Sequence, residues 1–366
     1  MYIFAIESSC DETSASVIRG ENGKIEVQSN IVSSQIPIHA LYGGVVPEIA
    51  SRAHCEAITN VARKAINEAG IALENIDAVA VTFAPGLIGS LLVGLSFAKS
   101  LASSLGIPLI PVNHIEAHVS AAYIENSALK PPYLALVVSG GHTSIYNVTD
   151  YVTFEEIGSS RDDACGEAFD KVGRVMGLPY PGGAAMDKLA TIGFETIDFS
   201  GKDALSFPTP AIADDSLDFS FSGLKTAVIN YIHNEKQKRK TDNLSDEVRS
   251  EIAAAFTASV CNGICKKLTS AIRSTNVKTV VMAGGVAANS HLRRSVARVC
   301  GDCDVEFIVP SLSLCGDNAA MVGAYAYHMY NLGLFADSSL NAYASDESAG
   351  IYKEQLINIH KRMPSK

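Results

Sequence analysis

The chain has 366 residues, a formal net charge of -10, and 47% hydrophobic against 19% charged residues. This balance allows a large buried core and excludes extended disorder, and the length fits two domains. The acidic charge disfavours a general nucleic-acid-binding surface, because backbone phosphates attract basic groups. The first residues run into a strand pattern without a basic region or a cleavage site, so we expect a cytoplasmic protein.

The first half of the chain predicts three strands followed by alternating helices and strands. The predicted elements are strands over 2–6, 14–18 and 24–32, a helix over 47–69, a strand over 77–83, a helix over 87–105, a strand over 109–112 and a helix holding 114–124. Within the uncharged run 78–98, Pro85 and Gly86 favour a strand, a turn and a helix over a membrane span.

The second half repeats this order. Its predicted elements are strands over 133–139, 143–148 and 152–157, then helices, a strand over 279–283, a helix, a strand over 305–309 and a last helix from about 317. A doubled βββαβαβα order predicts an α/β fold with two RNase H-like lobes that face each other across a cleft, as in the actin, Hsp70 and sugar-kinase (ASKHA) superfamily.

The domain boundaries follow from this repeat. We expect a first lobe over residues 1–132 and a second over 133–316, with a C-terminal helix over about 317–350 packing back on the first lobe. Residues 188–219 lose periodicity and gather Gly, Asp, Ser and Pro, which predicts an irregular insertion.

Three turns have the composition of anion-binding loops. Residues 8–13 and 139–143 lie between the first two strands of each lobe, where free N–H groups can hold phosphates. Gly284 and Gly285 follow a strand and precede a helix, which is a further place for a nucleotide. Asn289 at the end of this turn can hydrogen-bond a base or a ribose.

His114 and His118 lie four residues apart on a predicted helix, so both imidazoles share one face at chelating distance. The zinc-protease motif H-E-x-x-H needs a glutamate directly after the first histidine. Here Glu116 lies about 200° around the helix from His114, so the protease base is missing. The pair predicts a metal site with room for a carboxylate and for substrate.

The carboxylate favoured as third ligand is Asp317, where a loop enters the last helix. The last helix of this architecture crosses back toward the first lobe, although Asp317 also fits a simple helix N-cap. Asp170 and Asp187, which follow glycine-containing segments, can accept hydrogen bonds from ribose hydroxyls or orient a leaving group.

Seven segments in this order resemble the bacterial and organellar tRNA N6-adenosine threonylcarbamoyltransferase family. The resemblance runs from about Phe4 to Tyr330 and rests on the segments 7–13, 114–118, 138–143, 166–171, 220–226, 284–289 and 316–318. It implies transfer of a threonylcarbamoyl group from threonylcarbamoyl-AMP to N6 of the adenosine 3' of the anticodon (A37), in tRNAs reading codons that begin with adenine, with release of AMP.

The resemblance also implies roles for individual residues. The implied metal ligands and catalytic residues are His114, His118 and Asp317, with Fe2+ or alternatively Zn2+ as the ion. The implied contacts to the nucleotide-bearing substrate are Val137, Val138, Ser139, Gly140, Gly141, Asp170, Gly183, Asp187 and Asn289. The implied partners are tRNA, a non-catalytic paralogue (TsaB-like) and a small ATPase (TsaE-like), with no membrane.

Two positions depart from the family pattern. Thr209 stands where many relatives have arginine, and Gly316 stands where threonine is more usual. Two other functions stay open at this point. A small-molecule kinase of the same superfamily would use Asp11 or Asp170 to activate an alcohol but has no need of the histidine pair. A non-catalytic binding module would use the cleft only to change shape.

Overall fold

The computed structural model describes residues 1–199, 201, 204–210, 212, 215–346, 350, 352, 353 and 356. They form two compact units, which we call unit 1 and unit 2. Unit 1 comprises residues 1–130, 150–152 and 310–366, and unit 2 comprises residues 131–149 and 153–309. Residues 310–316, predicted for the second lobe, belong to unit 1, where the Ser311 N–H donates to Glu125 Oε2 at 2.8 Å.

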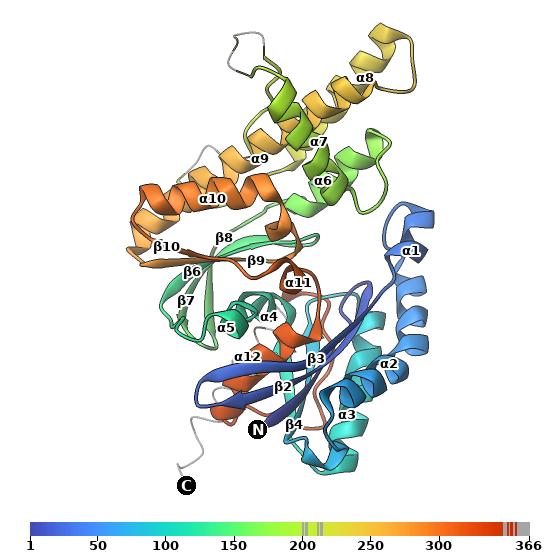
Figure 1. Ribbon diagram of the computed structural model, residues 1–366, viewed down its shortest axis with the longest axis vertical. Coiled ribbons are helices and arrows are strands. Elements are labelled where there is room, and N and C mark those ends of the chain that lie inside the picture. The colour runs from blue at the N-terminus through green and yellow to red at the C-terminus, as the bar shows by residue number, and fades with distance from the viewer. Residues whose placement is uncertain are drawn as a thin grey trace. The chain divides into compact units, whose positions relative to one another are not determined.

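Unit 1 is built on a five-stranded sheet in the order β3-β2-β1-β4-β5 (Figure 1). The strands are β1 Tyr2–Glu7, β2 Glu12–Glu21, β3 Lys24–Ser34, β4 Ala78–Ala84 and β5 Leu109–Asn113. The first three pair antiparallel, and β4 and β5 run parallel to β1. The helices are α1 Ile36–His39, η1 Ala40–Tyr42, α2 Pro47–Ala69, η2 Leu73–Asn75, α3 Ile88–Leu105, α4 His114–Ser120, α5 Ala122–Glu125, α11 Leu312–Cys315 and α12 Ala319–Asn331.

Helices cover both faces of this sheet, which explains why β1 and β4 are continuous apolar runs. Phe4 and Ile6 of β1 pack in one buried cluster with α2 and α3. On the other face α12 approaches so closely that a Cβ on Gly323 would lie 2.8 Å from the Ile18 side chain. The sheet therefore brings the end of β5 and the start of α12 to fixed places in one core.

Among the described helices, α3 has the length and composition that could cross a membrane. Its buried residues, including Leu91, Leu95 and Ala98, lie in the core cluster beside β4. This packing supports the predicted strand, turn and helix at this place.

Unit 2 repeats the sheet, in the order β10-β9-β6-β7-β8. Its strands are β6 Tyr133–Val138, β7 Thr143–Asp150, β8 Thr153–Ser159, β9 Thr279–Ala283 and β10 Glu306–Ile308. Its helices are α6 Cys165–Val175, α7 Gly182–Thr196, α8 Ser222–Arg239, α9 Asp246–Thr275, η3 Gly285–Ala288 and α10 Ser290–Asp302. When the strands of each unit are numbered in chain order, both sheets have the same spatial order, 3-2-1-4-5. The predicted α/β duplication is therefore confirmed.

Two predicted boundaries are wrong. The last helix, α12, ends at Asn331 rather than near residue 350, because Gly333 takes a positive φ of 67° that stops the helix. The predicted insertion at 188–219 begins too early, because α7 continues to Thr196 and packs along α9.

A candidate metal centre and a candidate nucleotide-binding group

The histidine pair is carried by α4, which begins directly after β5. The Asn113 side chain caps this helix by accepting from the N–H groups of Ile115 at 2.8 Å and Glu116 at 3.3 Å. Both histidines are buried, and their ring centroids lie 4.6 Å apart with planes at 77°. The cap fixes where the helix starts, and the four-residue spacing then brings both rings to one face.

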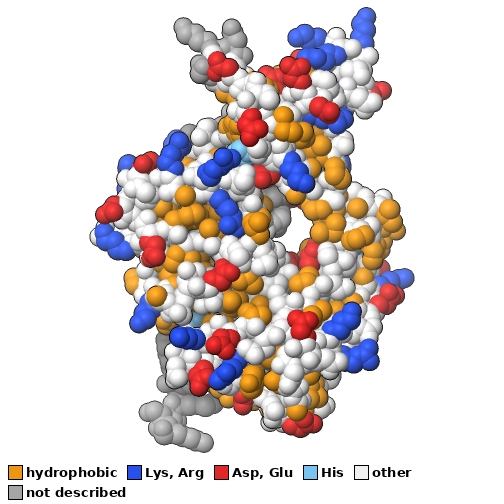
Figure 2. Space-filling model, in the orientation of Figure 1, with side chains coloured by type: hydrophobic (Ala, Val, Ile, Leu, Met, Phe, Trp, Pro, Cys, Tyr) orange, Lys and Arg blue, Asp and Glu red, His pale blue; other side chains and the backbone are white. Residues whose placement is uncertain are grey.

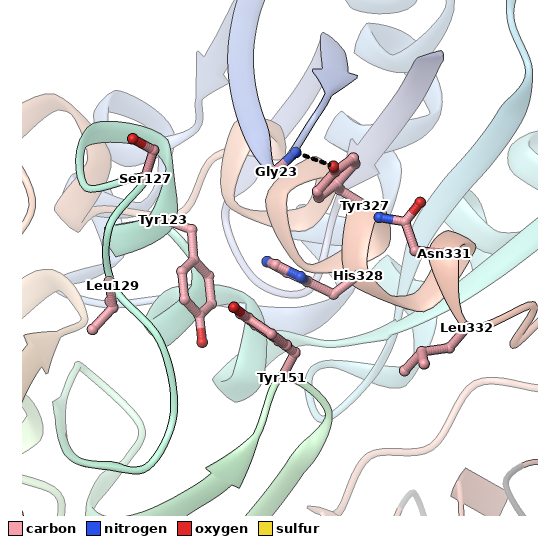
Figure 3. A pocket seen from close by; sticks show the side chains of 9 residues that line it. All are labelled: Gly23, Tyr123, Ser127, Leu129, Tyr151, Tyr327, His328, Asn331 and Leu332. Atoms are coloured by element: carbon pink, nitrogen blue, oxygen red, sulfur yellow. Dashed lines mark hydrogen bonds between the residues drawn. The ribbon is translucent and has the colours of Figure 1, made fainter.

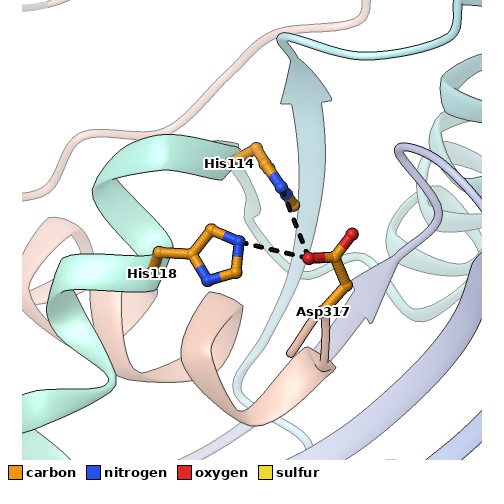
Figure 4. A group of neighbouring side chains, drawn as sticks. All are labelled: His114, His118 and Asp317. Carbon is orange, nitrogen blue, oxygen red and sulfur yellow. Dashed lines mark ion pairs between the residues drawn. The ribbon is translucent and has the colours of Figure 1, made fainter. Parts of the chain in front are cut away.

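Asp317, in the turn between α11 and α12, completes a group of three (Figure 4). Its Oδ1 lies 3.1 Å from His118 Nε2 and 3.7 Å from His114 Nε2. One ligand atom from each residue lies within 4.8 Å of the others, a spacing that one ion can bridge. The structure thus brings together the three residues that the sequence predicts as ligands.

Glu7 at the end of β1 supports this group from behind. Its Oε2 lies 3.1 Å from His114 Nδ1 and accepts from Thr82 Oγ1, while its Oε1 accepts from the Ser9 N–H, both at 2.6 Å. A carboxylate on Nδ1 holds the proton there and leaves Nε2 free to bind a metal. The spacing of residues in the sequence does not predict this role of Glu7. Glu7 is, however, the first residue of the segment 7–13, one of those that carry the family resemblance.

The chemistry of the donor set fits a metal ion. Neither ring nitrogen of the buried His118 has a hydrogen-bond partner among the described residues, although Nε2 points at the Asp317 carboxylate. Leaving a buried polar atom unpaired costs about 1–3 kcal/mol. Two imidazoles and one carboxylate are ligands that zinc and non-haem iron both accept, so the residues suit the predicted ion.

The charges around the group are strongly coupled. Burial lowers the pKa of His114, but the carboxylates of Glu7 and Asp317 outweigh it and raise that pKa to about 9. Burial, with Asp317 and Asp11, raises the pKa of Glu12 to about 9. A site that holds this much negative charge attracts cations, and a bound divalent ion would displace the proton of His114.

Glu116 lies on the opposite side of α4 and does not contribute to the group. It is buried and forms an ion pair with Lys353, with its neighbour Tyr325 from α12 close by. Burial raises the pKa of Glu116, although Lys353 opposes the shift. The glutamate is therefore not available as the base of a zinc protease, as the sequence predicts.

The predicted substrate contacts all lie in unit 2, around the hairpin between β6 and β7. The Ser139 N–H donates to the His142 carbonyl at 2.8 Å and closes the hairpin, and the Gly166 N–H of α6 donates to the Ser139 carbonyl at 3.1 Å. Gly284 packs on the same turn with a positive φ of 94°, and a Cβ there would lie 2.4 Å from the Val138 carbonyl oxygen. Open space lies beside Gly140, Gly141 and Gly183, where an added Cβ would meet no atom within 4 Å.

The polar members of this group have structural partners. Asp170 Oδ1 accepts from the Gly182 N–H at 2.7 Å, and Asp187 Oδ1 accepts from the Ser290 N–H and Oγ at 3.1 Å each. Asn289 is first of all the N-cap of α10, accepting from the N–H groups of His291 and Leu292. These three side chains hold helix starts in place.

Two details of the prediction change. The turn after β9 does not lead straight into a helix, because the 3-10 turn η3 intervenes and α10 begins only at Ser290. Val137 and Val138 are fully buried in β6, so their side chains belong to the core and only backbone near the turn is left for a ligand.

Comparison with known proteins decides the family. Residues 26–324 match the model of the tRNA N6-adenosine threonylcarbamoyltransferase family. The chain belongs to this family. It is 50% identical over 340 residues to the tRNA N6-adenosine threonylcarbamoyltransferase of Clostridium botulinum strain 657, covering 93% of this chain and 96% of the relative. The corresponding protein of Clostridium perfringens strain 13 is 49% identical with the same coverage.

Solved structures share the fold. HypF of T. kodakarensis superposes with a TM-score of 0.61 at 14% identity, over 91% of this chain and 48% of HypF. Component A of (R)-2-hydroxyglutaryl-CoA dehydratase from Acidaminococcus fermentans gives a TM-score of 0.50 at 15% identity, over 90% and 99% of the two chains. At these identities the likeness concerns the fold alone.

A cavity of about 250 Å³ in unit 1 lies away from the residues that the family resemblance implies (Figure 3). Tyr123, Tyr151 and His328 form its aromatic side, with the rings of Tyr151 and His328 stacked at 4.2 Å. None of the predicted ligands or substrate contacts lines it. For this family member, cavity size therefore does not locate the site.

Basic side chains gather at one end of α8 (Figure 2). Lys236, Lys238 and Arg239 form its last turn, and Glu235 pairs with Lys238 and Arg239. On α10, Arg294 lies 2.8 Å from the ring of His291. Each of these two basic patches is small for a family whose substrate is a tRNA.

Proposed function

We propose that the chain transfers a threonylcarbamoyl group from threonylcarbamoyl-AMP to N6 of the adenosine 3' of the anticodon, in tRNAs that read codons beginning with adenine. The observation that carries this proposal is the 49–50% identity to curated threonylcarbamoyltransferases over nearly the whole chain. In this reaction N6 forms a bond to the carbamoyl carbon, the bond from that carbon to the phosphate oxygen breaks, and AMP and the N6 proton leave. Family membership favours this acyl transfer over the phosphoryl transfer of a kinase.

We also propose that His114, His118 and Asp317 hold one divalent ion, Fe2+ or alternatively Zn2+. Three features support this assignment: His118 Nδ1 has no hydrogen-bond partner among the described residues, His118 Nε2 lies 3.1 Å from Asp317 Oδ1, and the Glu7 carboxylate lies at His114 Nδ1. When bound, such an ion supplies a Lewis acid that binds and polarises an oxygen of the substrate. Buried ligands and the Glu7 carboxylate preorganise the centre, so little rearrangement accompanies binding.

The unit 2 group is proposed to bind the nucleotide-bearing part of the substrate. The hairpin backbone at Gly140 and Gly141 lies next to open space, which suits the phosphate of a leaving AMP. One carboxylate oxygen of Asp170 and of Asp187 accepts a hydrogen bond at a helix start, and the side-chain Oδ1 of Asn289 does the same. Asp170, Asp187 and the amide NH2 of Asn289 are proposed to contact the ribose and base.

The partners and location follow from the substrate. Adenine N6 is a weak nucleophile, so orientation of the tRNA beside an activated acyl group supplies much of the rate. The small basic patches favour help from other proteins, and we propose a non-catalytic paralogue (TsaB-like) and a small ATPase (TsaE-like) in the cytoplasm.

A reconstituted transfer assay tests this function. The chain is incubated with threonine, bicarbonate, ATP, the enzyme that makes threonylcarbamoyl-AMP, the two proposed partners and an unmodified tRNA transcript, and nucleosides are analysed by mass spectrometry. We expect N6-threonylcarbamoyladenosine in the complete mixture. A transcript with guanosine in place of the target adenosine is the matched control. Equal modification of both transcripts, or none of either, would contradict the proposal.

A further inference from the structure

The described residues after α12 form a segment that we call the C-terminal strap, comprising residues 334–346 and Lys353. It starts at the open edge of the unit 1 sheet, where the Ala336 N–H donates to the Leu109 carbonyl of β5 at 2.8 Å. It then passes the end of β4, where the Tyr343 N–H donates to the Phe83 carbonyl at 3.0 Å. The Gly86 N–H donates to the Ala344 carbonyl at 3.3 Å. The strap is thus bonded to the start of β5, to the carboxyl end of β4 and to the turn that follows β4.

Buried side chains anchor the middle of the strap. Leu340 and Ala342 are 2% and 5% exposed and belong to the core cluster of unit 1. Lys99 of α3 donates to the Leu340 carbonyl at 3.0 Å. The middle of the strap is therefore fixed in the core of unit 1.

The far end of the strap contacts α4 at two points. Asp346 Oδ1 accepts from Asn113 Nδ2 at 2.5 Å, and the side-chain Oδ1 of the same Asn113 caps α4. Lys353 forms its ion pair with Glu116, and the Lys353 and Glu116 side chains are only 16% and 11% exposed. Lys353 Nζ also lies 5.6 Å from the ring centroid of Tyr325 on α12, the helix that follows Asp317.

The position of Glu116 makes these contacts relevant to the metal centre. It stands midway between His114 and His118 in sequence, about 200° around the helix from His114. The strap therefore holds α4 at its N-cap and on the face opposite the two imidazoles. α4 has only seven residues, and a helix this short has little stability of its own, so tertiary contacts set its orientation.

We propose that Asp346 and Lys353 are positioning residues, which hold α4 so that the imidazoles of His114 and His118 converge on Asp317. The strap thereby raises the affinity of the centre for a divalent ion without touching the ion. This inference rests on the proposed metal centre for its effect on affinity, and on the contacts above for its effect on α4.

The test compares a lysine of the strap, Lys353, with a lysine of α3 that bonds the strap, Lys99. Lys353→Met removes the ion pair on α4, whereas Lys99→Met removes a bond to the strap that does not touch α4. The probe ion is Co2+, whose visible spectrum reports the ligand geometry, with affinity measured by competition with a chelator. Supporting partners of metal ligands typically contribute 10- to 100-fold in affinity. We expect a loss in this range for Lys353→Met with an altered Co2+ spectrum, and unchanged affinity and spectrum for Lys99→Met.

A second readout does not depend on a metal. In ion-free protein, hydrogen–deuterium exchange of the peptide covering α4 should rise at least several-fold in Lys353→Met and stay unchanged in Lys99→Met. Lys353→Arg should restore both exchange and Co2+ affinity. Should Lys353→Met not fold, Asp346→Asn, which weakens the hold on Asn113, should show the same two effects at about 3- to 10-fold.

The outcomes separate the two claims. Wild-type protein that binds no Co2+, with faster α4 exchange in Lys353→Met, would overturn the metal centre and keep the positioning role. Wild-type protein that binds Co2+, with no change in affinity or α4 exchange in a folded Lys353→Met variant, would overturn the positioning role alone. Equal effects of Lys99→Met and Lys353→Met would also overturn it, because general loosening of the strap would then explain both.

Discussion

The candidate metal centre of unit 1 and the candidate nucleotide-binding group of unit 2 differ in how their polar atoms are satisfied. In unit 1, His118 has two buried ring nitrogens without a hydrogen-bond partner among the described residues, next to the Asp317 carboxylate. In unit 2, Asp170, Asp187 and Asn289 all accept hydrogen bonds from backbone N–H groups at helix starts. The first arrangement leaves a buried ring nitrogen without a hydrogen bond among the described residues, whereas the second already has a role in folding.

This difference shows what geometry can and cannot indicate about a site. Buried groups left unpaired are costly, so their persistence points to a ligand. Groups that cap helices are accounted for without one, and their functional role rests on the open space beside Gly140, Gly141 and Gly183 and on the family resemblance.

Removing a metal ligand should have the largest effect. We expect His118→Ala and Asp317→Ala each to lower divalent-ion affinity by more than about 100-fold, because a first ligand matters more than its supporting residues. Transfer activity should be lost in parallel while the fold is retained. Chelator competition and circular dichroism check this. His233→Ala, at an exposed position on α8, is the control, and a folded His118→Ala protein with normal ion affinity would remove that residue from the centre.

Glu7→Gln should have the next largest effect. An amide in this place cannot accept from both Ser9 N–H and Thr82 Oγ1 while also accepting from His114, so the ring loses its fixed proton. We expect a loss of about 10- to 100-fold in ion affinity, measured by the same competition. The exposed Glu48 of α2 supplies the control Glu48→Gln. Equal affinities of the two variants would mean that Glu7 only stabilises the fold.

Asn289 allows capping and ligand contact to be separated. Asn289→Ala should lose the cap of α10, at a cost of about 1 kcal/mol of stability, and should weaken binding of a non-hydrolysable threonylcarbamoyl adenylate analogue about 10-fold. Asn289→Ser keeps a capping oxygen but not the amide NH2, so stability should return and affinity should not. Asp170→Ala should weaken binding of the same analogue without changing the affinity for the divalent ion. Calorimetry measures both the stability of each variant and its affinity for the analogue. If Asn289→Ser kept wild-type stability and wild-type affinity, only the capping role of Asn289 would remain.

The smallest effect concerns tRNA. The net charge of -10 and the two short basic patches predict weak, salt-sensitive binding by the isolated chain, since few phosphates can be neutralised. Replacing Lys236 and Lys238 by alanine should lower affinity about 3- to 10-fold at low salt. The same change at the exposed Arg63 and Lys64 of α2 in unit 1 should have less effect. Filter binding at low and physiological salt measures both, and tight binding by the lone chain at physiological salt would contradict the prediction.

Much of the fold was predictable because local signals and tertiary packing agree. The helix predicted over 47–69 matches α2 at both ends, with Pro47 in its first turn and Gly70 at its C-cap in the left-handed conformation. The His114 and His118 pair was predictable for the same reason, since four-residue spacing on a helix is a local property. Predicting that Asp317 lies beside them required the topology of the whole architecture.

The parts that could not be predicted depend on contacts between distant segments. Glu7 reaches His114 only because β1 and β5 run in the same direction, so that their carboxyl ends lie on the same side of one sheet. Lys353 lies 237 positions from Glu116, beyond the predicted last helix, and spacing carries no signal for that ion pair. Asn289 was predicted as a ligand contact because an asparagine N-cap and a base contact have the same composition.

The most direct test of the central claim is a metal titration of the transferase. Ion-free protein is titrated with Fe2+ under anaerobic conditions, or with Zn2+, and bound ion and single-turnover transfer to tRNA are followed together, with the partners present. We predict that transfer rises in proportion to bound ion and reaches its plateau at one ion per chain. Full transfer by protein that holds no ion, or a plateau unaffected by His118→Ala, would contradict the account.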